Sequence, residues 1–254
     1  MRHIASIIVA VGMIICMSKP ASADLLSNGN MDLGVASPIG PGVFSPKPRF
    51  WNYEGFRTVS GLFEDGLALE PWAGPAPTPV TSDGDAPFPD GVGVGNDGGV
   101  FFKPFFGNGT TGDLITVHLY QFLPATPGAV YQFSGWAGAE ANALMGDARF
   151  ALEFLDSGGA LVGSDALSLI DTLKEPNGEP FSYKFYSLTS TAPENAVLLR
   201  ARISMIDGMI NPSGGGQAYV VDDFTLTIIP EPAGALLLAA GIPMLLRRKR
   251  TVRA

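Results

Sequence analysis

Two short segments in the middle of the chain combine an aromatic ring with side chains that form hydrogen bonds. His118 precedes Tyr120 by two residues, and Gln132 precedes Trp136 by four. On a β-strand, residues two or four apart lie on the same face. An aromatic ring stacks on the C–H face of a sugar, and neighbouring donors and acceptors bind its hydroxyl groups. These four residues are the candidate ligand-binding residues of an outer groove, unless a loop folds over the rings and buries them.

The same segments offer little for catalysis. A Ser-His-Asp arrangement would need His118, and its surroundings lack the strand-turn-helix pattern that exposes a nucleophilic serine. A pair of carboxylates of the glycosidase kind would have to come from four glutamates, Glu54, Glu64, Glu140 and Glu153. No motif selects two of them. We therefore predict no catalytic residues, and a glycan-active hydrolase is the least favoured function.

Composition restricts metal and redox chemistry. The only cysteine, Cys16, lies in the first 23 residues, and His118 is the only histidine after them. A disulfide framework, a cysteine-ligated zinc and a multi-histidine centre are thereby excluded from the middle of the chain. The acidic stretch from Asp83 to Asp97 lacks the spacing of a calcium-binding EF-hand loop, so we expect a solvated loop there.

The charges are unevenly distributed. Nine basic residues face 23 acidic ones between residues 24 and 229, although the whole chain has a net charge of −8. The other basic residues lie at the two ends, two within the first 23 positions and five within the last eight. An acidic surface repels phosphate backbones. Nucleic acid is therefore excluded as a partner, and cations or neutral polymers are favoured.

The N-terminus has the three parts of a secretory signal peptide. Arg2 precedes an apolar run over residues 4–17, and Ala21-Ser22-Ala23 forms an A-x-A cleavage site. We predict a signal peptide over residues 1–23, cleaved after Ala23. A membrane anchor is the alternative, but the apolar run is too short to span a bilayer and is followed by Lys19 and Pro20.

The C-terminus carries three features in a fixed order. Pro230-Glu231-Pro232 precedes an apolar stretch over residues 233–246, which is shorter than the ~20 residues of a bilayer span. A basic cluster follows, which would stay on the cytoplasmic side, and its members are Arg247, Arg248, Lys249 and Arg250. This order resembles the PEP-CTERM sorting signal of Gram-negative bacteria. An ordinary C-terminal anchor is the alternative.

The PEP-CTERM resemblance covers residues 230–254 and implies an export route. It implies as partners the secretion machinery and an exosortase-like membrane protease that processes the tail. It also implies transient anchoring in the inner membrane, followed by release to the cell surface or extracellular matrix. Proteins of this kind commonly accompany exopolysaccharide production, so an exopolysaccharide is a further implied partner.

The middle of the chain alternates apolar and polar residues with the period of a β-strand. Gly and Pro together account for 53 of the 254 residues, which favours short strands joined by turns. The clearest predicted strands are Leu114–Leu123, Ala129–Ala137, Ala148–Leu155, Val197–Met205 and Ala218–Ile229, and weaker ones are Trp51–Val59 and Val100–Phe106. We predict loops over residues 38–48, 71–89 and 90–99. In Val197–Met205 we expect Val197 to face the core, and in the last strand Val220, Phe224, Leu226 and Ile228 to share one face.

Strands with one apolar face predict a single antiparallel β-sandwich from residue 24 to residue 229. Four motifs in order resemble galactose-binding-like jelly rolls, which include carbohydrate-binding modules. They are Leu26-Ser27-Asn28-Gly29-Asn30-Met31-Asp32, the stretch from Pro127 to Trp136, Phe154-Leu155-Asp156-Ser157-Gly158-Gly159 and Val220-Val221-Asp222-Asp223-Phe224-Thr225-Leu226. The resemblance implies a jelly roll, with Met31-Asp32 in place of the family's Phe-Glu.

The same resemblance implies a structural calcium ion between the first and last strands. Calcium takes six to eight oxygen ligands, and carboxylates from two ends of a chain can supply some of them. By resemblance, the ligands would be Asp32 and Asp222, with Ca²⁺ as the only expected cofactor. The alternative is that Asp222 and Asp223 flank an edge strand without binding a metal.

The sequence therefore predicts an exported all-β protein whose sandwich binds a polysaccharide without acting on it. A structural surface or matrix protein without a small ligand is the alternative, because it needs the same exported, acidic sandwich.

Overall fold

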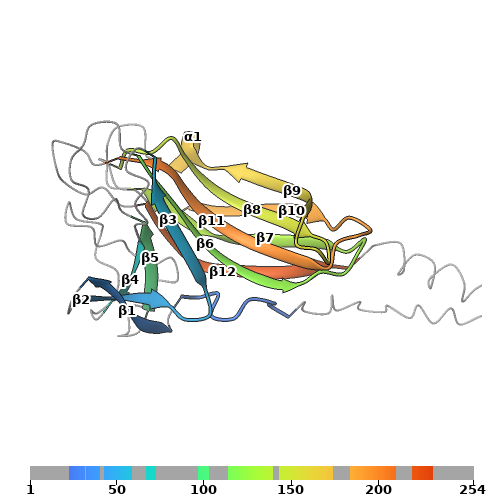
Figure 1. The fold of residues 1–254 in the computed structure, drawn as a ribbon, viewed down its shortest axis with the longest axis horizontal. Helices are drawn as coiled ribbons and strands as arrows, with labels where there is room; N and C mark the ends of the chain where they lie inside the picture. Colours follow the sequence, from blue (N-terminus) through green and yellow to red (C-terminus); the bar gives the residue numbers. More distant parts are fainter. Residues whose placement is uncertain are drawn as a thin grey trace, which may run out of the picture.

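The computed structural model describes residues 23–31, 33–40, 43–58, 67–72, 97–102, 114–139, 143–173, 184–209 and 219–230. Within these ranges the chain forms twelve β-strands and one short helix (Figure 1). The elements are β1 Gly34–Gly40, β2 Val43–Pro48, β3 Asn52–Arg57, β4 Leu67–Trp72, β5 Asp97–Phe102, β6 Ile115–Pro124, β7 Val130–Ala139, β8 Asp147–Leu155, β9 Leu161–Ser168, α1 Ile170–Leu173, β10 Lys184–Thr191, β11 Leu198–Gly208 and β12 Tyr219–Ile229.

Ten of these strands form two five-stranded antiparallel sheets. The first sheet has the order β3-β6-β11-β8-β9, and the second has the order β10-β7-β12-β5-β4. The remaining two strands, β1 and β2, pair with each other. The prediction of an antiparallel jelly-roll sandwich is therefore confirmed.

The inner faces of the two sheets form one hydrophobic core. Side chains at alternate positions of β6, β8 and β11 are fully buried, as the period-two pattern predicts, and they include Ile115, Val117, Leu119, Phe150, Leu152, Phe154, Leu199, Ala201 and Ile203. From the second sheet, Tyr131 and Phe133 of β7 pack against them, with Phe133 5.6 Å from Phe150 between ring centroids. Burial of these residues is the main stabilising contribution of the sandwich.

The last strand contains an irregularity that changes which residues face the core. β12 pairs with β7 so that Asp222 lies opposite Trp136 but Thr225 lies opposite Ser134, which leaves one extra residue in β12. This is a β-bulge, and Asp223 there has a φ of 51°. Val220 therefore lies on the outer side of β12, and the prediction that it shares a face with Phe224 is wrong.

The bulge places Phe224 at the centre of the core. Its ring stacks on Phe133 at 5.4 Å, and its edge or face meets Phe150 at 5.1 Å and Trp51 at 6.0 Å. Gly135 of β7 lies directly beneath it, and a Cβ on Gly135 would come within 2.4 Å of the ring. A glycine is therefore required at this position.

The Leu26–Asn30 motif joins the N-terminal segment to the sandwich. Leu25 N donates to Leu226 O at 2.8 Å, and an Asp24 carboxylate oxygen accepts from Leu226 N at 2.9 Å. Asn28 has a φ of 56°, and its side chain bonds the backbone of Leu33 and Arg49. Together, Asp24, Leu25 and Asn28 connect β12 with the chain on either side of β1 and β2.

Other expectations need correction. β1 and β2 occupy most of residues 38–48, which we predicted to be a loop. The last two residues of β4 and the start of β5 fall in the other two predicted loops. β9 and β10 were not predicted. Val197 precedes β11 and is 44% exposed, so it does not face the core.

The two terminal segments fall outside the described part of the chain. Residues 1–22 and 231–254 are not among the described residues, so the signal peptide and sorting tail remain predictions from sequence. Ala23 and Pro230, the outermost members of these segments that are described, are exposed. Among the described elements, none is a helix of the length and apolarity that a membrane crossing requires.

Candidate functional site

The structure places the four candidate ligand-binding residues on two different surfaces. His118 and Tyr120 lie on β6 of the first sheet, at positions that alternate with the buried Val117 and Leu119. Gln132 and Trp136 lie on β7 of the second sheet, alternating with buried residues in the same way. Because the sheets pack through their inner faces, the two outer faces point in opposite directions. The four residues therefore do not share one groove.

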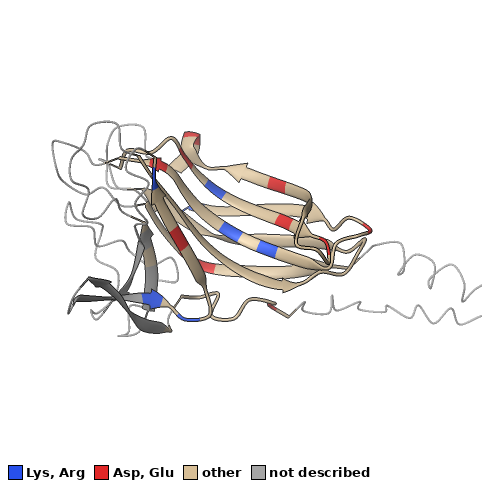
Figure 2. Cartoon of the chain, in the orientation of Figure 1, with Lys and Arg blue, Asp and Glu red and all other residues tan. Residues whose placement is uncertain are grey.

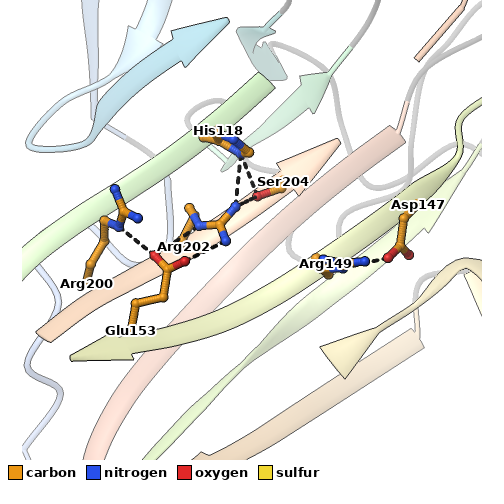
Figure 3. A network of polar contacts seen from close by, with 7 residues as sticks. All are labelled: His118, Asp147, Arg149, Glu153, Arg200, Arg202 and Ser204. Atoms are coloured by element: carbon orange, nitrogen blue, oxygen red, sulfur yellow. Dashed lines mark hydrogen bonds and ion pairs between the residues drawn. The ribbon is translucent and has the colours of Figure 1, made fainter. Parts of the chain in front are cut away.

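On the outer face of the first sheet, five residues form a connected polar network (Figure 3). Glu153 of β8 accepts from Arg200 Nε at 2.5 Å and from Arg202 Nη2 at 2.6 Å. Arg202 Nη1 donates to Ser204 Oγ at 2.7 Å and contacts His118 Nδ1 at 3.1 Å. His118 Nδ1 and Ser204 Oγ are 2.8 Å apart. We call these residues, His118, Glu153, Arg200, Arg202 and Ser204, the arginine–glutamate network.

The register of the strands brings these residues together. Arg202 lies opposite Tyr120 of β6, and Ser204 lies opposite His118. Arg200 lies opposite Glu153 on the other side, in β8. Directly opposed residues of antiparallel strands are close neighbours on one face. Three strands of the first sheet therefore contribute to the network, and these strands are adjacent.

The charges of the network determine its protonation. Burial favours the neutral form of Glu153, but hydrogen bonds and charges from Arg202 and Arg200 outweigh it and lower the pKa of this carboxyl. Burial lowers the pKa of His118 to about 4, and the charges of Arg202 and Arg200 act in the same direction. At neutral pH, Glu153 is therefore ionised and His118 is neutral.

The tautomer of His118 follows from its neighbours. A guanidinium nitrogen can only donate, so His118 Nδ1 must accept from Arg202 Nη1. The neutral ring then carries its proton on Nε2. Ser204 Oγ accepts from Arg202 and can donate its own hydrogen to His118 Nδ1. Every contact in the network therefore joins a donor to an acceptor.

Two aromatic rings lie beside the network. Tyr120 and Phe122 of β6 meet edge to face, with their centroids 5.4 Å apart. The guanidinium of Arg200 lies 5.5 Å from the Tyr120 centroid and 5.9 Å from that of Phe122. Phe122 is 47% exposed, and Tyr120 is partly exposed. The first sheet thus presents an accessible aromatic pair next to fixed charged groups.

This face carries several charged residues of both signs. Three of the nine basic residues between positions 24 and 229 lie on it, Arg149 on β8 and Arg200 and Arg202 on β11. Figure 2 shows blue segments, for Lys and Arg, among red ones on the strands of this sheet. Arg149 of β8 pairs with Asp147 at 2.6 Å, separately from the network. Each of these arginines has a carboxylate partner, so the surface is rich in charge without a large net charge.

The second sheet carries a different surface. Trp136 of β7 meets Phe185 of β10 edge to face, with centroids 5.5 Å apart. Gln132 Nε2 donates to Ser187 Oγ at 3.0 Å, and the hydroxyls of Ser134 and Thr225 are 2.8 Å apart. Phe185 is 57% exposed and Trp136 is partly exposed, so no loop buries the aromatic pair completely. We call this surface the tryptophan face.

The geometry does not favour catalysis at the arginine–glutamate network. Ser204 is completely buried, so its hydroxyl is not accessible as a nucleophile. A catalytic acid needs a raised pKa, whereas that of Glu153 is lowered. Glu54 is exposed on β3, opposite His118, and Glu64 and Glu140 lie outside the described residues.

The predicted calcium ligands are only partly described. Asp32 lies outside the described residues. Asp222 is buried in β12, where its Oδ1 accepts from Asp223 N at 2.7 Å. Within the described ranges, the structure contains no group of three histidine, cysteine, aspartate or glutamate residues able to hold a metal ion. Calcium binding through Asp32 and Asp222 therefore remains a prediction.

Sequence reasoning missed several residues of both surfaces. Arg200 and Arg202 were not among the candidates, and Glu153 was named only as one of four available glutamates. All three alternate with core residues on two predicted strands, and charges on the polar positions of those strands are the signal that could have found them. Phe122 lies two residues after Tyr120, so the period of a strand places it on the same face of β6 as His118 and Tyr120. Phe185 gave no signal, because β10 was not predicted.

No protein-family model matches the sequence, and no curated protein sequence matches it either. Solved structures show a distant likeness. One is the enzymatically active domain of tailspike protein 4 from bacteriophage CBA120, at 14% identity and a TM-score of 0.45 over 81% of this chain and 21% of that one. Another is TmCBM61 in complex with β-1,4-galactotriose, at 16% identity and a TM-score of 0.40 over 82% of this chain and all of that one. A third is the CBM22-1 xylan-binding domain of Paenibacillus barcinonensis Xyn10C, at 12% identity and a TM-score of 0.36 over 72% of this chain and 88% of that one.

Proposed function

We propose that the sandwich is a non-catalytic polysaccharide-binding module, and that the outer face of the first sheet holds the ligand. The observation that carries this proposal is the accessible Tyr120–Phe122 pair beside the arginine–glutamate network. A sugar ring stacks on an aromatic face, and its hydroxyls need donors and acceptors at fixed positions.

The network supplies groups that are already ordered before a ligand arrives. Glu153, Ser204 and His118 each bond the side chain of Arg202. Because this side chain is already fixed, little conformational freedom is lost when a ligand binds beside it. Arg200 lies at the aromatic pair and is the more exposed of the two arginines. Charge-assisted hydrogen bonds from such a group to sugar hydroxyls are stronger than neutral ones.

The proposal includes the route by which the protein reaches its ligand. The signal peptide over residues 1–23 and the tail over residues 230–254 support export through the secretion machinery, processing by an exosortase-like protease, and a final place at the cell surface or in the extracellular matrix. The host's exopolysaccharide is then the ligand within reach. Intact-mass analysis of the exported protein tests the route: Asp24 should be its first residue, and a secreted species that retains residues 247–250 would contradict the sorting proposal.

A glycan array that includes the host's exopolysaccharide tests the binding proposal. Tyr120→Ala and Phe122→Ala should each weaken binding by about 1–3 kcal/mol, as expected for an aromatic anchor. The matched control is Phe50→Ala, which removes a ring that is also exposed, in the turn after β2. Melting curves establish that each variant is folded. A folded wild-type protein that binds no glycan would overturn the proposal and favour a structural matrix role.

A further inference from the structure

The tryptophan face has the chemistry of a separate binding surface. Its described outward positions on β7 and β10 carry amide, hydroxyl and aromatic groups, among them Gln132, Trp136, Phe185 and Ser187. The carboxylate of Asp222, opposite Trp136, is buried, and its neighbour Asp223 in the β12 bulge is partly exposed. The described outward positions of β7 and β10 are therefore uncharged, in contrast to those of β8 and β11 in the first sheet.

The aromatic pair of this face is accessible although large aromatic side chains are usually buried. Phe185 is more than half exposed on β10, which is an edge strand of the second sheet. Its ring is inclined by 66° to that of Trp136. The two rings thus offer apolar surface at an angle to each other, and the hydrogen-bonded Gln132 and Ser187 lie further along the same two strands.

These properties select one kind of occupant. A phosphate-bearing ligand or an anionic membrane would require basic side chains. A protein partner of ordinary size would require a larger apolar centre than two rings beside a row of hydroxyls. Rings next to uncharged donors and acceptors match a neutral sugar chain, whose apolar C–H faces alternate with hydroxyl groups.

We propose that the tryptophan face binds an uncharged polysaccharide, with Trp136 and Phe185 as its stacking platform. The face points away from the proposed site at Tyr120, so one molecule can hold two polysaccharide chains and cross-link them. The cross-linking rests on the proposed function, whereas binding at Trp136 and Phe185 does not. Two linked sites also give an avidity that neither has alone.

Affinity gel electrophoresis of the exported protein in gels containing dextran, xylan or β-1,4-galactan tests the second site, with alginate as the anionic comparison. Tyr120→Ala should leave part of the retardation by at least one neutral polysaccharide. Adding Phe185→Ala should reduce the remaining binding at least tenfold, and Trp136→Ala should do the same. Phe50→Ala is the control for loss of an exposed ring, and circular dichroism establishes folding. The exposure of Phe185 makes its variant the safer test, because little core packing is removed.

Light scattering from a soluble polysaccharide that binds tests cross-linking. The wild-type protein should increase the apparent particle radius, and Tyr120→Ala or Phe185→Ala alone should abolish the increase while retaining binding. If Tyr120→Ala removes all binding and Phe185→Ala none, the second site is wrong and the proposed function stands. If the reverse holds, the proposed function and the cross-linking are wrong and the tryptophan face is the site. Failure to bind any polysaccharide overturns both.

Discussion

Gly29 and Phe224 approach so closely that a Cβ on Gly29 would lie 2.1 Å from the Phe224 carbonyl oxygen. Phe224 N donates to Gly29 O at 2.8 Å, so the two residues are bound through their backbones as well. This contact lies at the β12 bulge, where Phe224 turns into the core. The N-terminal segment therefore helps to hold the bulge that positions the central aromatic residue.

We expect Gly29→Ala to destabilise the sandwich by at least about 2–3 kcal/mol, because the methyl group cannot fit without moving the backbone of β12. Urea denaturation measures the change. Gly158→Ala is the control, since its Cβ would meet only an Asp156 side-chain oxygen at 3.3 Å in a surface turn. Equal stability of the two variants would show that the N-terminal segment is not packed against β12 in solution.

Breaking the arginine–glutamate network should cost more free energy of unfolding than breaking the Arg149–Asp147 ion pair on the same face. Glu153→Gln leaves Arg200 and Arg202 without their charged partner in a mostly buried place, and we expect a loss of about 3 kcal/mol in unfolding free energy. Arg149→Ala removes a residue whose side chain is 42% exposed, and we expect less than about 1 kcal/mol. A Glu153→Gln variant as stable as the wild type would mean that the network contributes only to ligand binding.

Acidification should weaken the fold in two overlapping steps. Unfolded His118 takes up a proton near pH 6.5, whereas folded His118 resists it down to about pH 4, so stability is lost as the pH falls between these values. The lowered pKa of Glu153 stabilises the fold above its ordinary pKa, and this contribution is lost as the pH falls further. Chemical denaturation at a series of pH values should show the loss, and His118→Gln should make the curve flatter between pH 6.5 and 4. An unchanged slope in that variant would contradict the assignment.

Calcium should raise the melting temperature if Asp32 and Asp222 hold the ion, and chelation should lower it. Asp222 lies in β12 two residues before Phe224, to which the N-terminal segment is bound, so a metal would join the same two parts of the chain. Asp222→Asn should remove the calcium-dependent part of the melting temperature, and the neighbouring Asp223→Asn is the control. The same melting temperature with saturating calcium and with chelator would reject the prediction.

The strands that the sequence predicted well are those with a buried, regular face. In β6, β7, β8 and β11, apolar residues alternate with polar ones because one side of each strand lies in the core. β10 escaped prediction because its aromatic residues, Phe185 and Tyr186, are adjacent and lie on opposite faces. β1 and β2 escaped because both contain proline, which argues against regular sheet pairing.

The sequence by itself determined which residues of a strand share a face, and so it identified His118 with Tyr120 and Gln132 with Trp136. Only the tertiary structure decided that these pairs lie on opposite surfaces, because local alternation contains no information on which strands become neighbours. The order β3-β6-β11-β8-β9 brought Glu153 to Arg200 and Arg202, some 47 and 49 positions away in the chain. One extra residue in β12 reversed the alternation after Asp222, since a bulge shifts every later side chain to the other face.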